Sequence, residues 1–185
     1  TWSTWEPKDG TFDFTYLHRV LKAAQKFNLN VIVGTPTYAI PSWLDKKYPD
    51  ILCETHQGKN HYGARQNFDI THPGYLFHAE RIIRRLMEEV QPYDCVIGFQ
   101  LDNETKHYDT CAPRVQEQFK EWLKERFVTV EALNQHFGFA YWSNSIADWD
   151  DLPDVRGTIN GSFGAEFSAF QRNLVTDFLL WQRKI

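Results

Sequence analysis

Cysteine is scarce in this sequence: the 185 residues include only Cys53, Cys95 and Cys111. They are odd in number and far apart, so neither a disulfide framework nor a Cys-x-x-Cys metal site can be read from them. Cys95 opens an apolar run, and we expect it to be a buried structural thiol. Reduced cysteines fit a cytoplasmic protein, and we expect that location.

The sequence also lacks an excess of basic residues and any long apolar run. Its 20 Lys and Arg stand against 24 Asp and Glu, a net charge of −4. This balance argues against a nucleic-acid partner, because phosphate binding needs a basic surface. No apolar run approaches the roughly 18 residues that a membrane span requires, so we expect no membrane partner. No signal peptide is recognisable, but the sequence begins Thr-Trp-Ser-Thr without an initiator Met, so this says little about export.

Aromatic residues, in contrast, are abundant. They make up 16% of the chain, within a hydrophobic content of 42% that is typical of a globular protein. Aromatic planes stack well on the C–H faces of sugars, so the composition suits a carbohydrate site. It suits a large aromatic core equally well.

The hydrophobic pattern alternates strands with helices. Apolar residues at helical spacing predict helices near residues 13–24, 79–90, 115–123, 130–137 and 167–181, with Asp13 as the N-cap of the first. Short β-branched runs predict strands at 31–34 and 95–101, both buried on two faces. The segments 36–73 and 142–164 are predicted to be irregular. Trp2 resembles the tail of an earlier strand.

Two strand–helix units of this kind predict an α/β fold with parallel strand pairing. Two strands cannot close a sheet, and a complete (β/α)₈ barrel needs about 250 residues. We therefore expect a partial (β/α)₈ TIM barrel, from the end of strand 2 through strand 4 and the helices that follow. Residues 1–185 would be an internal segment of one catalytic barrel domain, with strand 5 onward absent.

The run at 95–101 ends abruptly in Asp102, Asn103 and Glu104. These residues fall at the carboxyl end of a predicted strand, where α/β barrels carry their chemistry. Asn followed by Glu at that position is common in retaining glycosidases, in which the Glu protonates the leaving oxygen and the Asn binds the sugar 2-hydroxyl. The alternative is a strand that ends in an ordinary polar loop.

Several stretches resemble glycoside hydrolase family 42, the bacterial β-galactosidases whose catalytic carboxylates lie on barrel strands 4 and 7. The similarity covers roughly residues 2–150. The matching stretches are Glu-Pro-Lys-Asp-Gly-Thr-Phe-Asp-Phe at 6–14, Pro-Ser-Trp-Leu at 41–44, Gly-Ala-Arg at 63–65 and Gly-Phe-Gln-Leu-Asp-Asn-Glu at 98–104.

The resemblance implies a retaining β-galactosidase that releases terminal β-D-galactose by two-carboxylate double displacement. Glu104 would be the general acid/base, and Arg65 and Asn103 would hold the sugar. A general acid must carry its proton near neutral pH, which favours a partly desolvated carboxyl group with a second carboxylate nearby. That second carboxylate, a Glu on strand 7, has no counterpart after Glu104. Glu166 and the acidic residues at 148–154 are expected to be solvated, and the isolated segment is expected to be inactive.

The resemblance also bears on metals and partners. Some members hold zinc on four cysteines, but the corresponding positions here are Asp69, Thr110, Ala112 and Val115. Zinc needs thiolate or imidazole ligands, and the histidines lack metal spacing, so we expect no metal and no cofactor. The expected partner is a β-galactoside oligosaccharide, bound by a homo-oligomer, by resemblance a trimer. Trp142 would line the mouth of the site or pack in the core.

Two other functions remain open at this point. A related clan member would act on β-glucosides or on α-arabinopyranosides, whose ring differs from galactose only at the 5-substituent. A degenerate barrel would bind carbohydrate without hydrolysing it. Residues Arg65, Asn103 and Glu104 count against the degenerate barrel, because a binding protein has no need of an acid at a strand tip.

Overall fold

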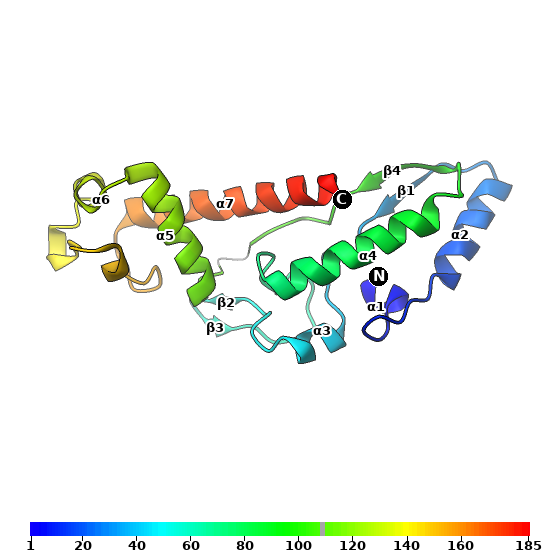
Figure 1. The fold of residues 1–185 in the computed structure, drawn as a ribbon, viewed down its shortest axis with the longest axis horizontal. Helices are drawn as coiled ribbons and strands as arrows, with labels where there is room; N and C mark the ends of the chain where they lie inside the picture. Colours follow the sequence, from blue (N-terminus) through cyan, green and yellow to red (C-terminus); the bar gives the residue numbers. More distant parts are fainter. Residues whose placement is uncertain (108–109) are drawn as a thin grey trace.

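The computed structural model describes residues 1–107 and 110–185, and Figure 1 shows an elongated α/β molecule. Its helices are α1 (Trp2–Trp5), α2 (Thr15–Lys26), α3 (Ser42–Lys47), α4 (Pro73–Val90), α5 (Pro113–Phe127), α6 (Val130–Phe137) and α7 (Gly161–Lys184), with 3₁₀ turns η1 (Tyr141–Ser143) and η2 (Trp149–Asp151). The strands are β1 (Val31–Gly34), β2 (Glu54–Thr55), β3 (Gly58–Lys59) and β4 (Val96–Gln100).

Strands β1 and β4 pair in parallel, as predicted, with Gly34 opposite Gln100. Helix α4 lies between them in the sequence and shares one hydrophobic core with both strands and with α2. Leu21, Val33, Leu86 and Cys95 are buried in that core, so the prediction of a buried Cys95 is confirmed. Because the pairing is parallel, the chain leaves both strands at the same end of the sheet.

The prediction that both strands are buried on two faces is wrong for the described residues. Ile32 is 65% exposed, Ile97 62% and Phe99 43%. The sheet in this part of the chain has two strands only, so each is an edge strand, and no described element covers these side chains.

Three further predictions need correction. Trp2 is not the tail of a strand: it begins the short helix α1, is 1% exposed, and donates from Nε1 to Glu6 at 2.9 Å. Segment 36–73 is not irregular throughout, because it contains α3 and the β2–β3 hairpin. The third correction is small: α2 has Phe14 as its N-cap residue, while the Asp13 carboxylate accepts from the backbone N–H of Thr15 at 2.9 Å.

The second core lies at the other end of the molecule, between α5, α6 and the first half of α7 (Figure 1). Phe119 is at its centre, with its ring centroid 5.0 to 5.4 Å from those of Phe163, Phe167 and Phe170. Much of the aromatic content is therefore core, the plainer of the two interpretations of the composition.

Candidate functional site

The loop that follows β4 carries Asn103 and Glu104, and three hydroxyl groups fix its start. The backbone N–H of Asp102 donates to Thr35 Oγ1 at 2.7 Å, and its carboxylate accepts from Thr37 at 2.6 Å and from Thr105 at 2.5 Å. Thr35 and Thr37 directly follow β1. The carboxyl ends of the two parallel strands are thus joined at one point.

This loop has an unusual backbone. Asp102 and Glu104 both have positive φ, of 56° and 49°, which non-glycine residues adopt infrequently. Such conformations persist where the surroundings hold them, and they gather at functional sites. Here the hydrogen bonds to the buried Asp102 supply that restraint.

Helices α4 and α7 close the network from two sides. Tyr75 of α4 donates from its hydroxyl to the Thr37 carbonyl at 2.8 Å, and burial, with the charge of Asp102, raises the pKa of Tyr75 well above its usual value. Gln182 of α7 accepts from Thr35 Oγ1 at 2.9 Å. The two loops that follow β1 and β4, together with α4 and α7, therefore contribute to one polar cluster at the start of the loop that carries Glu104.

The loop that carries Arg65 is tied to the same place by Gln66. The Gln66 side-chain amide donates to the Glu104 carbonyl at 2.7 Å and to the Asn103 carbonyl. Gln66 is buried and also has positive φ, 56°. Gln66 was not among the predicted site residues, and its only signal in the sequence is its place directly after the Gly-Ala-Arg motif.

The three predicted site residues come together. Arg65 Nη2 lies 2.7 Å from Glu104 Oε2, and Asn103 Oδ1 accepts from Gln100 at 3.1 Å. The Arg65 and Glu104 side chains are 53% and 60% exposed. The arrangement therefore offers a carboxyl group, a guanidinium fork and a carboxamide to a hydroxyl-rich ligand from the outside. The desolvation that suits a general acid is not provided by the described residues.

The carboxylates expected to be solvated are of two kinds. The Asp side chains at 148–154 are exposed, as predicted. Glu166 is not solvated: its side chain is only 14% exposed, and it accepts from Trp122 Nε1 at 2.7 Å and pairs with Arg126 at 2.8 Å. Glu166 thus ties α7 to α5. Trp142 is 69% exposed, so the alternative that it packs in the core is wrong.

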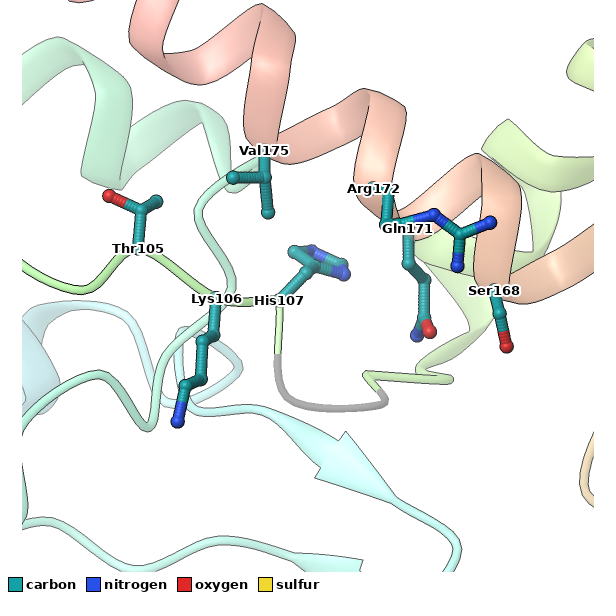
Figure 2. A pocket seen from close by; sticks show the side chains of 7 residues that line it. All are labelled: Thr105, Lys106, His107, Ser168, Gln171, Arg172 and Val175. Atoms are coloured by element: carbon teal, nitrogen blue, oxygen red, sulfur yellow. The ribbon is translucent and has the colours of Figure 1, made fainter.

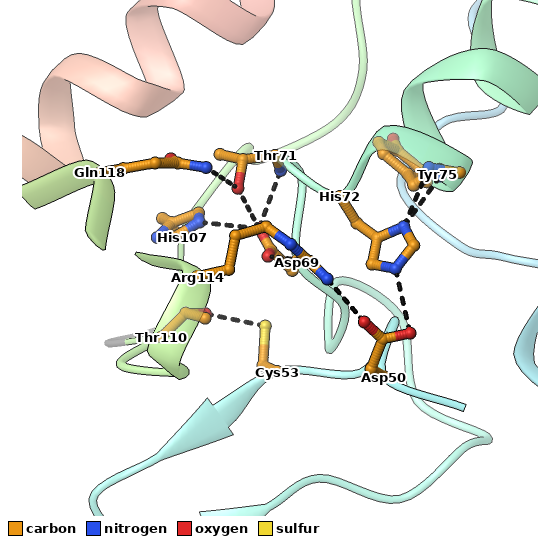
Figure 3. Close-up of polar contacts among 11 residues, drawn as sticks. Asp50, Cys53, Asp69, Thr71, His72, Tyr75, His107, Thr110, Arg114 and Gln118 are labelled. Carbon is orange, nitrogen blue, oxygen red and sulfur yellow. Dashed lines mark hydrogen bonds and ion pairs between the residues drawn. The ribbon is translucent and has the colours of Figure 1, made fainter. Parts of the chain in front are cut away.

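Of the four positions aligned with zinc ligands, Asp69 and Thr110 belong to a polar cluster (Figure 3), whereas Val115 is buried in the second hydrophobic core and Ala112 packs against it. Asp69 accepts from Thr71 at 2.7 Å and from Arg114 at 3.1 Å, and it lies 3.4 Å from His107 Nε2. Burial alone raises the pKa of Asp69, but hydrogen bonds from His107 and Thr71 outweigh it, and the pKa lies below its usual value.

Thr110, also in that cluster, donates to Cys53 Sγ at 2.8 Å, and burial raises the pKa of the Cys53 thiol to about 12. A thiol of this kind gives little thiolate for a metal. Among residues 1–107 and 110–185, no group of three or more His, Cys, Asp or Glu side chains is placed to hold a metal ion. Nor does any helix in these ranges have the length and apolar character to cross a membrane.

Comparison with known proteins gives one consistent result. The family model Glyco_hydro_42, described as beta-galactosidase, matches residues 1–185. A beta-galactosidase of Lactobacillus acidophilus is 31% identical over 185 residues, 98% of this chain and 27% of that protein. One of Thermus thermophilus is 37% identical over 146 residues, 77% of this chain and 23% of that protein.

Among solved structures, the beta-galactosidase from Bacillus circulans sp. alkalophilus superposes with a TM-score of 0.91 at 27% identity, covering 99% of this chain and 28% of that one. The chain thus spans about a quarter of the length of the relatives it matches.

Proposed function

Because the chain belongs to glycoside hydrolase family 42, we propose that the protein that carries it is a retaining glycosidase releasing terminal β-D-galactose from β-galactosides. The observation that carries the proposal is the meeting of Glu104, Arg65 and Asn103 at the carboxyl end of β4. Beta-galactosidases are the relatives and structural neighbours described above, and the substrate is inferred from them.

In the proposed reaction Glu104 works twice. As an acid it gives its proton to the glycosidic oxygen while a second carboxylate attacks the anomeric carbon and the bond to the leaving group breaks. As a base it then takes a proton from water, whose oxygen displaces the enzyme carboxylate and restores the original anomeric configuration. We propose that the second carboxylate is a Glu outside this chain, because Glu166 is occupied in packing α7 on α5.

Arg65 and Asn103 are proposed to hold the reacting galactose. In the structure Arg65 bonds to Glu104 itself, so a bound sugar would take over guanidinium N–H groups that now pair with the acid/base. Asn103 is fixed at its carbonyl by Gln66 and at its side chain by Gln100. Its carboxamide nitrogen would donate to the sugar 2-hydroxyl, a bond that strengthens in the transition state.

We propose that β1 and β4 are the third and fourth strands of a TIM barrel and that residues 1–185 are an internal segment of that one domain. The exposed Ile32, Ile97 and Phe99 support this placement, because further strands and their layered side chains would cover them. On this proposal the segment alone is inactive, and the intact protein is a cytoplasmic homo-oligomer that needs neither metal nor cofactor.

The test is substrate choice and stereochemistry in the intact protein. We expect hydrolysis of p-nitrophenyl β-galactoside to exceed that of the β-glucoside and of the α-arabinopyranoside, and proton NMR to show β-galactose as the first product. A preference for glucoside or arabinoside would assign the protein to the alternative substrates. Binding without hydrolysis of any of the three would identify a degenerate barrel and contradict the proposal.

A further inference from the structure

A polar pocket of about 630 Å³ begins one residue after Glu104. One wall is the loop at residues 105–107, and the other is the side of α7 that carries Ser168, Gln171, Arg172 and Val175 (Figure 2). Neither Arg65 nor Asn103 lines it. The residues at 104–107 span at most about 11 Å of chain, so the pocket adjoins the proposed acid/base while being separate from the groups assigned to the galactose.

Lys106 and Arg172 line this pocket, and none of its described lining residues is an Asp or Glu. In the part of the chain that the structure describes, no ion pair joins Arg172 to a carboxylate. An exposed guanidinium with its donors available is the preferred partner of a planar carboxylate or of a sulfate group.

His107 provides a second and independent observation. Its side chain is 1% exposed, and its Nδ1 atom, which is buried, has no hydrogen-bond partner among the described residues. Figure 2 shows the ring on the loop wall, facing the α7 side chains. A buried polar atom without a partner is costly, so a group that bonds to Nδ1 would remove a penalty as well as add a contact.

The other ring nitrogen of His107 indicates what kind of group this is. Nε2 lies 3.4 Å from the Asp69 carboxylate, which accepts hydrogen bonds. In the tautomer that carries its N–H on Nε2, Nδ1 is an acceptor and suits a sugar hydroxyl. With the Arg172 guanidinium on the facing wall, the pocket offers an acceptor to a hydroxyl and donors to a group of negative charge.

We propose that this pocket binds an acidic group, a carboxylate or sulfate ester, on the leaving-group sugar of the substrate. The substrate class would then be β-galactosides linked to an acidic sugar. The inference rests on the proposed function in one respect: Glu104 protonates the leaving-group oxygen, so a pocket next to Glu104 and apart from Arg65 and Asn103 receives the leaving group. Val175 offers a small apolar contact for the C–H face of that sugar.

The experiment compares two galactosyl disaccharides in the intact protein at low ionic strength. They differ only at C6 of the leaving-group sugar, which carries a carboxylate in one and a hydroxymethyl group in the other; a 6-sulfated disaccharide is a third arm. We expect kcat/KM to be about tenfold higher for the acidic substrates. Arg172→Gln should abolish that preference while leaving the rate on p-nitrophenyl β-galactoside unchanged. Arg183→Gln, an exposed arginine on the same helix, should keep the preference.

Three results would overturn the proposal: equal kcat/KM for acidic and neutral disaccharides, a preference that survives Arg172→Gln, or inhibition by inorganic sulfate with no effect of the sugar's own charge. No hydrolysis of the aryl galactoside would instead contradict the proposed function. In that case equilibrium binding tests whether the pocket prefers an acidic sugar. Methyl β-glucuronide should bind to the wild type more tightly than methyl β-glucoside does, and the two should bind equally to the Arg172→Gln variant. Equal binding to the wild type would overturn the pocket too.

Discussion

At the scale of single residues, the site is held more by its supporting side chains than by the residues proposed to touch sugar. Asp102 and Gln66 are buried and make short hydrogen bonds, whereas Arg65 and Glu104 are more than half exposed. The supporting residues fix the backbone at Asn103 and Glu104. Mutations at Asn103 therefore test a contact to substrate with little disturbance of the fold.

Asn103→Ala should lower kcat/KM on β-galactosides by a factor that corresponds to at least about 2 kcal/mol of lost transition-state stabilisation, because the proposed bond to the 2-hydroxyl is strongest in the transition state. Most of the loss should appear in kcat. Steady-state kinetics on the intact protein measure it, with the exposed Asn144→Ala as the matched control. An Asn103→Ala enzyme with wild-type kcat would remove Asn103 from the proposed site.

Asp69 is a buried carboxylate, 1% exposed, whose charge is expected to contribute to stability. Its pKa is lower in the folded protein than its usual value, so its contribution is present above about pH 4 and is lost as the pH falls through the folded pKa. Asp69→Asn should cost roughly 1–3 kcal/mol at pH 7, because Arg114 and His107 lose a charged acceptor.

The measurement for Asp69 is urea denaturation of the intact protein between pH 3 and pH 7. The difference between wild type and Asp69→Asn should shrink as the pH falls below about 4. The exposed Asp94→Asn serves as control and should differ little from wild type at any pH. A difference for Asp69→Asn that stays constant across this range would contradict the assigned pKa direction.

At the scale of secondary-structure elements, substitutions at two helix glycines distinguish the effect of helix propensity from the effect of side-chain packing. A Cβ atom on Gly74 of α4 would lie 2.6 Å from the Tyr48 ring, whereas one on Gly164 of α7 would meet nothing within 4 Å. Tyr48 packs its ring on His72 and His78, so it cannot move aside freely.

Gly74→Ala is therefore expected to destabilise the protein by about 1–3 kcal/mol through overpacking, and Gly164→Ala to stabilise it by about 0.5–1 kcal/mol through helix propensity. Thermal or urea unfolding of the two variants checks both signs. If both substitutions stabilised the protein, the close approach of Tyr48 to α4 would be wrong.

Some secondary-structure elements could be predicted from the sequence. Helices α2, α4, α5, α6 and α7 and strands β1 and β4 follow from hydrophobic spacing, because the apolar residues that mark them in the sequence are those that pack in the core. Segment 36–73 was harder: α3 and the β2–β3 hairpin are too short for periodicity to be seen, and they are fixed by long-range contacts such as Cys111 N–H to the Glu54 carbonyl at 2.7 Å.

The residues of the candidate site also include some that the sequence predicted and some that it did not. Arg65, Asn103 and Glu104 were found through motifs, and the hydrogen bonds of Gln66 to the carbonyls of Asn103 and Glu104 bring the Arg65 loop to them. Gln66 and Gln182 were missed because a buried glutamine that bonds to a distant loop has no local pattern. His107 was missed for the same reason, since its partner Asp69 lies 38 positions away.

At the scale of the whole molecule, the main feature is that apolar side chains of β1 and β4 are exposed and that no described element covers them. Ile32, Ile97 and Phe99 lie on two edge strands with open hydrogen-bonding edges, a combination that favours association with other chains.

The 185-residue chain, expressed alone, should therefore self-associate and bind a hydrophobic dye. The double substitution Ile97→Ser and Phe99→Ser should reduce both effects. Ile159→Ser, at an exposed residue outside the strands, should not. Analytical ultracentrifugation is the measurement. A wild-type chain that stays monomeric at every concentration would contradict the proposal that other parts of a barrel cover these strands.

The role of Glu104 is the central claim, and one measurement on the intact protein tests it directly. Glu104→Ala should lose nearly all activity on lactose-like substrates, whose leaving groups need a proton, but keep much of its first-step rate on activated aryl galactosides. Added azide should then restore turnover and yield β-galactosyl azide, because an anionic nucleophile needs no base. The exposed Glu125→Ala should behave as wild type. Full activity of Glu104→Ala on lactose, or no azide product, would contradict the account.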